Sequence, residues 1–220
     1  MALSKLKYNS LNVTPVADKA IGFDSGADDL SSSLSGGSMT FIKKITASSD
    51  SDISFVDGTS SVVLDNTYKE YLFTWNSIHP ATDGVQFQVN FRDGGSSYDA
   101  TKTTTTFEAY HREDDESGLG YKNSQHLAQS TGVQKISASI GNDNDQAGCG
   151  YLYLFDPSDT TFVKHFIVRT VHYSGGESND YVEDYYTSGY CNVTAAIDGV
   201  QFSMSSGNID AGDICLYGIS

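Results

Sequence analysis

Apolar and polar residues alternate along most of this chain beyond residue 38, and this period of two is typical of half-buried β-strands. Clusters of Gly, Asp, Ser and Asn separate the alternating runs and indicate tight turns. We therefore predict an all-β protein with roughly ten or eleven strands. The predicted strands cover residues 41–45, 53–56, 68–75, 85–91, 103–110, 135–140, 151–155, 162–173 and 187–197, followed by two closing strands.

The two closing strands form a predicted hairpin. The first lies in the alternating run IDGVQFSMSS at residues 197–206, and the second is an apolar run that extends to Ile219. Gly207 and Asn208 mark the turn between them, because both residue types tolerate the left-handed backbone angles that tight turns require. The second strand is expected to be buried, which would lock this end of the chain into the core.

Length and composition fit a single sandwich or barrel. At 220 residues the chain is long enough to bury a full hydrophobic core in one unit. It contains 14 Tyr and 11 Phe, which favour strands, and only 3 Pro. The composition therefore supports the all-β prediction.

The closing segment GNIDAGDICLYGIS, at residues 207–220, resembles the C-terminal hairpin of β-sandwich structural proteins encoded by tailed bacteriophages. In those proteins a similar ending closes a jelly roll. The segment YLFTWNSIHPATDG, at residues 71–84, is similar to a strand and turn that occur early in the same domain. The resemblance spans roughly residues 40–220, and its motifs are structural rather than catalytic. It implies a jelly-roll-like antiparallel β-sandwich in a tail-fibre or head-decoration protein.

Residues 1–38 differ in composition from the rest and are predicted to form an extended N-terminal arm or linker, ahead of a β-sandwich domain at residues 39–220. Ser and Gly dominate residues 31–38, as they do in flexible linkers. In a virion, such an arm would dock on a neighbouring protein and gain order there. The alternatives are a flexible tail and an added edge strand.

The resemblance also implies a location and partners. Residues 1–7 contain no apolar core of a signal peptide, so we expect a virion component that is made in the host cytoplasm. The expected partners are other virion proteins and further copies of this chain in a homo-oligomer, with a trimer as one form. The chain lacks the heptad repeats that would indicate a coiled-coil trimer.

The acidic charge balance argues against two classes of partner. The formal net charge is −15, whereas nucleic-acid binding relies on Lys and Arg to displace counterions from phosphates. Anionic membrane surfaces are repelled for the same reason. No segment approaches the ~20 consecutive apolar residues of a membrane-spanning helix. We therefore expect neither nucleic-acid binding nor membrane insertion.

Established catalytic motifs are missing from the sequence, including G-x-S-x-G, H-E-x-x-H and the glycine-rich phosphate loops. We therefore expect neither enzymatic activity nor a cofactor. His165 and His172 are an odd number of residues apart, so on one strand they would face opposite sides. The charged run at residues 112–116 indicates a solvated loop.

Two weaker signals concern metals and thiols. Asp143 and Asp145 provide alternating oxygen ligands that suit calcium, but an Asn/Asp-rich turn explains the same residues and the rest of an EF-hand loop is missing. The three cysteines, Cys149, Cys191 and Cys215, have no CxxC spacing and are interpreted as small buried residues. A disulfide between two of them remains an alternative.

Tyrosines are concentrated after the polar segment at residues 174–180. Tyr181, Tyr185, Tyr186 and Tyr190 accompany carboxylates there. Tyrosines in such a setting can stack on sugar rings and hydrogen-bond to sugar hydroxyls, which makes these four residues candidate ligand-binding residues. The alternative is that they pack in the core, at a sandwich edge or in a subunit interface.

Two functional hypotheses follow. The first is a non-enzymatic virion structural protein, attached as a tail or head appendage through its N-terminal arm and contacting host-surface glycans. The second is a carbohydrate-binding module or a carbohydrate-active enzyme on a β-sandwich. An enzyme of that kind would need two carboxylates about 5 to 10 Å apart in one cleft. Glu108, Glu113 and Asp114 are the carboxylates whose substitution would distinguish the two hypotheses.

Overall fold

The structure is a computed structural model that describes residues 22–23, 30–31, 38–174 and 180–220. The chain divides into two units, residues 1–40 and 41–220. The predicted N-terminal arm therefore lies mostly outside the described residues. Within it, strands β1 (Gly22–Phe23) and β2 (Leu30–Ser31) pair in antiparallel fashion.

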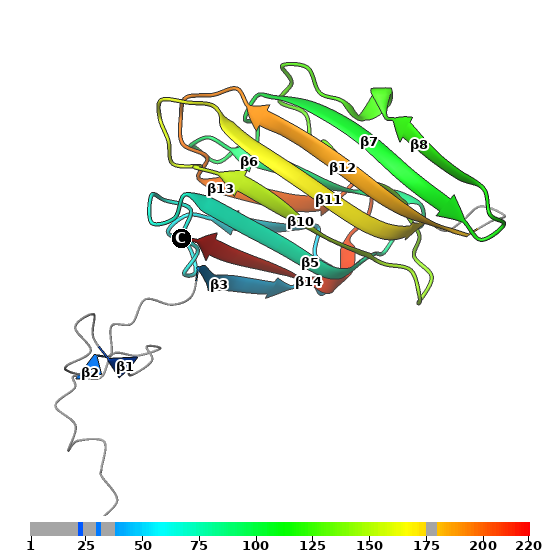
Figure 1. Cartoon of the computed structure of the whole chain (residues 1–220), viewed down its shortest axis with the longest axis horizontal. Helices are drawn as coiled ribbons and strands as arrows, with labels where there is room; N and C mark the ends of the chain where they lie inside the picture. Colours follow the sequence, from blue (N-terminus) through cyan, green and yellow to red (C-terminus); the bar gives the residue numbers. More distant parts are fainter. Residues whose placement is uncertain (1–21, 24–29, 32–37, 175–179) are drawn as a thin grey trace, which may run out of the picture. The chain divides into compact units, whose positions relative to one another are not determined.

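Two antiparallel sheets make up the second unit, and they pack as a sandwich (Figure 1). The large sheet has the strand order β3-β14-β5-β10-β11-β12-β7-β8, and the small sheet has the order β4-β13-β6-β9. The strands of the large sheet are β3 (Met39–Thr46), β14 (Ile209–Ile219), β5 (Glu70–Pro80), β10 (Gly148–Phe155), β11 (Lys164–Ser174), β12 (Tyr181–Cys191), β7 (Lys102–Arg112) and β8 (Ser117–Tyr121). Those of the small sheet are β4 (Asp52–Val56), β13 (Gly199–Met204), β6 (Val85–Arg92) and β9 (Gln134–Ile140).

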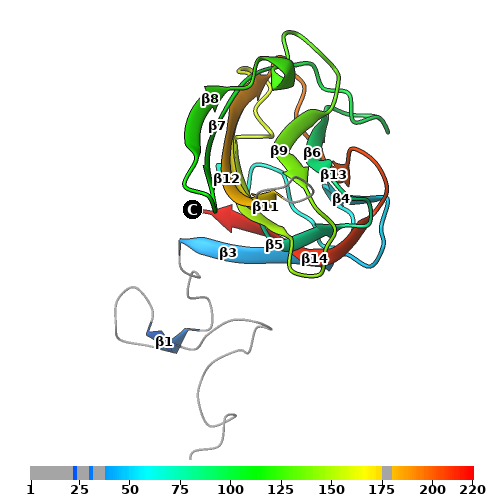
Figure 2. The same ribbon diagram turned by 90° about the vertical axis from the view of Figure 1, so that its right-hand side faces the viewer.

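The chain crosses repeatedly between the two sheets. Strands β3 to β6 alternate between the large and the small sheet, and β13 and β14 again belong to different sheets. Viewed from the end, the large sheet curves around the small one (Figure 2). The single helical element of the described residues is the short 3₁₀ turn η2 (Asn123–Gln125). The prediction of a jelly-roll-like antiparallel β-sandwich is confirmed.

Most predicted strands occur at the expected positions, with two exceptions. The strand expected at residues 187–197 is β12, which begins at Tyr181 and ends at Cys191. Residues 181–186 were not predicted as strand, because the adjacent carboxylates of Glu183 and Asp184 interrupt the alternation of apolar and polar residues. Strand β8 was missed, since it contains two glycines and follows directly on the charged turn.

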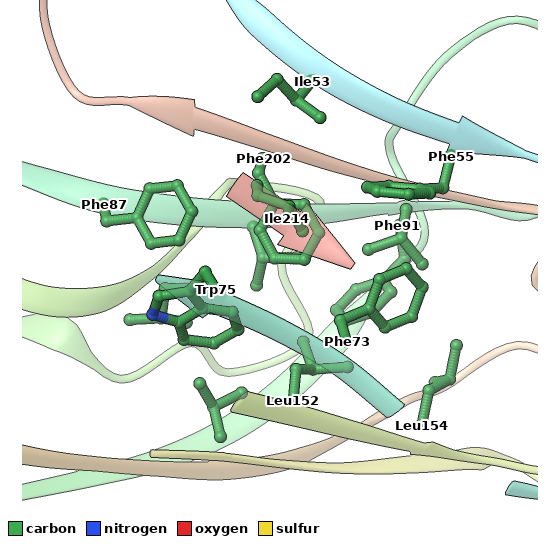
Figure 3. Packing of buried hydrophobic residues seen from close by; sticks show 14 of the residues in the cluster. Ile53, Phe55, Phe73, Trp75, Phe87, Phe91, Leu152, Leu154, Phe202 and Ile214 are labelled. Atoms are coloured by element: carbon green, nitrogen blue, oxygen red, sulfur yellow. The ribbon is translucent and has the colours of Figure 1, made fainter. Parts of the chain in front are cut away.

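The core lies where the small sheet covers the centre of the large one (Figure 3). Phe202 of β13 is fully buried and stacks on Phe87, with ring centroids 5.6 Å apart. Its ring also contacts Phe73 and Trp75 of the large sheet, at centroid distances of 5.7 and 5.9 Å. These aromatic contacts join the two sheets.

The two closing strands occur as predicted, but they do not pair with each other as a hairpin, because they belong to different sheets and hold inner positions there. Strand β13 lies between β4 and β6, and β14 lies between β3 and β5. Gly207 in the turn has a φ of +69°, which glycine adopts without steric cost. Ile214 and Leu216 of β14 are fully buried. The expectation that the second closing strand is buried is confirmed, whereas the expectation that the two strands pair in a hairpin was wrong.

All three cysteines are free, so the disulfide alternative is wrong. Cys191 and Cys215 are buried, as expected, and Cys149 is half-buried. Burial raises the pKa of the Cys191 thiol to about 12, which keeps it protonated at neutral pH.

Among the described residues, no helix has the length and apolar character needed to cross a membrane.

Replacement of Phe202 by Ala should lower the free energy of unfolding by about 3–5 kcal/mol, because it leaves a cavity between the sheets. The transition can be followed in urea through the fluorescence of Trp75, the only tryptophan of the chain. Phe162→Ala is the matched control, since that ring is 71% exposed and its loss should change stability by about 0.5 kcal/mol at most. Equal effects of the two substitutions would contradict the central role of Phe202.

Candidate functional site

The inner face of the large sheet changes from apolar to polar toward one corner. Along β11 the buried residues Phe166 and Val168 are followed by Thr170, His172 and Ser174, which are also buried. Cross-strand pairing extends this polar region over β12 and β7. One row pairs His172 with Glu183 and Glu183 with Tyr110, and the next pairs Thr170 with Tyr185 and Tyr185 with Glu108.

An open cleft with a volume of about 590 Å³ lies over this polar corner. Its floor comes from β7, β11 and β12 of the large sheet, and part of its wall comes from β6 and β9 of the small sheet. The hydroxyl of Ser174 donates a hydrogen bond to the carbonyl oxygen of Ser139 at 3.0 Å, which ties the two sheets together beside the cleft. The lining residues are Asp83, Gly84, Gln86, Glu108, Tyr110, Arg112, Lys122, Gln125, Ala138, Ser139, Ser174, Tyr181 and Glu183.

Two buried carboxyl groups lie at the base of the cleft. Glu108 and Glu183 are diagonal neighbours on β7 and β12, and their side chains are 7% and 2% exposed. Burial raises the pKa of Glu108 to about 7, and a hydrogen bond with the Glu183 carboxyl adds to this increase, while the ammonium of Lys122 opposes it. The charged form of Glu108 is disfavoured at this position, because two adjacent buried negative charges are unfavourable.

His172 and Tyr185 lie behind the carboxyl pair and do not line the cleft. Burial lowers the pKa of His172 to about 4, so its ring is neutral at neutral pH. The contact between His172 Nε2 and Glu183 Oε2, 3.4 Å long, is therefore not an ion pair under those conditions. Burial, together with the charges of Glu108 and Glu183, raises the pKa of the Tyr185 hydroxyl far above its ordinary value of 10.0.

Two cations stand at the rim of the cleft. Lys122 forms an ion pair with Glu108, and Arg112 contacts Glu116 through Nη1 and Oε2 at 2.9 Å and Asp114 through Nε and Oδ1 at 3.4 Å. The guanidinium group of Arg112 is thus paired with acidic residues of the β7–β8 turn. The cleft consequently has no large excess of positive charge with which to select an anion.

Several buried polar atoms around the cleft have no hydrogen-bond partner among the described residues. They include Glu108 Oε2, Glu183 Oε1 and Gln125 Oε1, which belong to residues that line the cleft. Buried polar atoms are normally paired, so atoms left unpaired at the base of an open cleft are available to a ligand or to water. The site therefore offers both hydrogen-bond donors and acceptors, next to the rings of Tyr110 and Tyr181, whose centroids are 6.0 Å apart.

The four tyrosines proposed from the sequence do not form one surface. All four belong to β12, where successive residues point to opposite faces of the sheet. Tyr181 lines the cleft, and Tyr185 is fully buried beneath it. Tyr186 and Tyr190 have the opposite parity and lie on the outer face of the large sheet. Of the four tyrosines, only Tyr181 therefore lines the cleft.

The calcium candidates Asp143 and Asp145 lie in an exposed turn. The backbone NH of Gln146 donates to the carbonyl oxygen of Asp143 at 2.9 Å, as in a tight turn. Within residues 38–174 and 180–220, and in the two short described strands before them, no group of three or more His, Cys, Asp or Glu side chains is suited to hold a metal ion. The turn interpretation of these residues fits the structure.

The other candidate residues are also separated by the fold. Glu113 and Asp114 lie in the exposed β7–β8 turn, as the solvated-loop interpretation predicted, whereas Glu108 lies in the cleft. His165 is exposed and His172 is buried, which confirms that they face opposite sides of one strand. Sequence reasoning did not identify Glu183 and His172 as site residues, and only correct bounds for β12 would have placed Glu183 beside Glu108.

Comparisons of this chain with protein-family models, with curated proteins and with solved structures give no match.

Replacement of Glu108 by Gln should stabilise the protein at high pH relative to the unmodified chain. A carboxyl whose pKa rises on folding contributes stability below its unfolded value, near 4.5, and that contribution is lost as the pH rises through about 7. The amide of Gln does not ionise. The difference in unfolding free energy between variant and wild type should therefore increase by up to about 3 kcal/mol between pH 4.5 and pH 8.

Urea denaturation at several pH values measures this difference. The titration of His172 affects both proteins and largely cancels from the difference. Glu113→Gln, in the exposed turn, is the control and should give a flat difference across the same range. A flat difference for Glu108→Gln would show that the carboxyl is not held in the buried environment described above.

Proposed function

We propose that this chain is a non-enzymatic structural component of a tailed-bacteriophage virion, an appendage whose β-sandwich binds a host-surface saccharide in the polar cleft. The observation that carries the saccharide assignment is the set of unpartnered buried polar atoms at the base of this open cleft. The virion assignment is supported by the resemblance of residues 207–220 and of residues 71–84 to tailed-phage structural proteins.

The chemistry of the cleft favours a ligand with many hydroxyl groups. Each hydroxyl both donates and accepts a hydrogen bond, and the cleft offers Glu183 and Gln125 oxygens as acceptors and Lys122 as a donor. The rings of Tyr110 and Tyr181 provide apolar surface against which the C–H faces of a sugar ring can pack. A purely apolar ligand would leave the buried carboxyl oxygens unpaired, which is unfavourable.

The geometry of the carboxyl pair favours binding over bond cleavage. Glycoside hydrolases hold two carboxyl groups about 5 to 10 Å apart, on either side of the scissile bond. Glu108 and Glu183 instead lie on adjacent strands of the same sheet, on one side of the cleft, and not on two sides of a bound sugar. This arrangement supports a binding site rather than a hydrolase. Release of reducing sugar from a host polysaccharide, abolished in Glu108→Gln, would favour the carbohydrate-active alternative.

Binding of the full chain to a panel of bacterial surface polysaccharides tests the proposed ligand class. Against any polysaccharide that binds, Tyr181→Ala and Gln86→Ala should each raise the dissociation constant about tenfold, because each removes a contact of about 1.4 kcal/mol. The measurement is biolayer interferometry on immobilised polysaccharide.

Tyr190→Ala is the matched control for this experiment. Tyr190 lies on the same strand as Tyr181 but points to the opposite face, the outer face of the large sheet. The affinity of the Tyr190→Ala variant for the polysaccharide should therefore equal that of the wild type. Equal loss of affinity in Tyr190→Ala and Tyr181→Ala would place the ligand elsewhere. Absence of binding across the panel would contradict the saccharide assignment and would leave the virion assignment to be tested separately.

A further inference from the structure

The outer face of the large sheet carries aromatic and aliphatic side chains where a solvated sheet would carry polar ones. One cross-strand row passes through Tyr151, Arg169, Tyr186, Phe107 and Tyr121 on five neighbouring strands. The rings of Phe107 and Tyr186 stack with centroids 4.7 Å apart, and the guanidinium of Arg169 lies 5.0 Å from the Tyr186 centroid. The row is therefore a packed and ordered surface.

Aliphatic residues extend this surface along the strands. Ile167 pairs with Tyr153 across β10 and β11, and Val171 and Val182 lie further along β11 and β12. Ile167, Val171 and Val182 are 46%, 43% and 49% exposed. Exposed apolar side chains that gather over one continuous surface, rather than singly, mark an interaction site.

The outer face of the small sheet provides an internal comparison. Its corresponding row runs through Asp52, Ser203, Gln88 and Lys135, all of which are polar. Side chains along the strands of both sheets therefore alternate between an inner and an outer face, but only the small sheet has a polar outer face. Figures 1 and 2 show that the small sheet packs against the opposite side of the large sheet and leaves this outer face uncovered by the sandwich.

Charge is also depleted from this face. At the outward positions of β7, β10, β11 and β12, Arg169 and Asp184 are the only Asp, Glu, Lys or Arg residues. They pair with each other, with Arg169 Nε 2.9 Å from Asp184 Oδ1. The whole chain carries a net charge of −15, so this area is an electrically neutral patch on an acidic protein. Depletion of charge and enrichment in aromatic residues are features of the centre of protein–protein interfaces.

We propose that this outer face of the large sheet is the interface through which two copies of the chain associate face to face, around a two-fold axis. The inference does not depend on the proposed saccharide site, because the cleft lies on the inner face of the sheet.

Three features favour a second copy as the occupant. Two identical surfaces of net charge zero meet without the repulsion that the rest of this acidic protein would produce. Arg169 and Asp184 have opposite signs, so a two-fold axis between them would bring each one close to its opposite charge on the other copy. Two sheets with apolar outer faces also pack readily on each other, at a separation of about 10 Å.

The size of the face is sufficient for a stable dimer. Six neighbouring strands of the sheet, in the order β5-β10-β11-β12-β7-β8, make up the face. With a spacing of about 4.8 Å and about seven residues per strand at about 3.3 Å each, they cover a flat area of roughly 650 Å². This lies within the range of about 600–1,000 Å² that each partner buries in a stable complex.

Sedimentation equilibrium of the full chain tests this interface. At tens of micromolar the protein should have twice the chain mass of 23.7 kDa. Ile167→Asp places an unpaired charge at the centre of the face and should raise the dimer dissociation constant at least a hundredfold. Val133→Asp is the matched control, because Val133 is 41% exposed but precedes β9 of the small sheet, and it should leave the dimer intact.

Each outcome is decisive. Circular dichroism tests whether the Ile167→Asp variant folds. If this variant is unfolded, the milder Ile167→Thr takes its place, with a smaller expected increase in the dimer dissociation constant. A monomeric wild-type chain at these concentrations would overturn the proposal. So would a trimer, which a two-fold pairing of one face cannot form, and so would an oligomer that Ile167→Asp leaves unchanged.

Discussion

The two closing strands, β13 and β14, are the elements on which both sheets depend. Strand β13 is an inner strand of the small sheet and β14 is an inner strand of the large one, so a single turn at Gly207 links the two layers. Phe202 of β13 then contacts aromatic rings from both sheets. Without these two strands, β4 and β3 would each lose their neighbour, and the centre of the core would open.

The unequal width of the two sheets accounts for the cleft. Four strands cannot cover the inner face of eight, so the corner formed by β7, β11 and β12 lies partly open. The residues there reverse the usual preference for apolar side chains inside and charged side chains outside. Glu108 is 7% exposed while the adjacent Phe107 is 41% exposed, and Glu183 is 2% exposed while Val182 is 49% exposed. The same strands thus place carboxyl groups in the cleft and apolar side chains on the outer face.

This inversion also explains what the sequence could and could not predict. The fold class, the two closing strands and most other strands followed from alternation and turn residues, because the centre of the sandwich obeys the ordinary rule of apolar residues inside. That the closing strands separate into two sheets, and do not pair as a hairpin, did not follow from alternation, because a hairpin and a crossover between sheets have the same pattern. At the corner, the same rule places Phe107 inside and Glu108 outside, which is the reverse of the structure. The segment that begins at Tyr181 contains two adjacent carboxylates and was not predicted as a strand, so the position of Glu183 diagonal to Glu108 could not be foreseen.

We propose that this domain is displayed on a virus particle, where its cleft meets the host surface. Gold-labelled antibodies against the sandwich domain, applied to purified intact particles and viewed by electron microscopy, test it most directly. The account predicts label on the particle, either at the tail or over the head. Unlabelled particles whose protein complement also lacks the chain by mass spectrometry would contradict it.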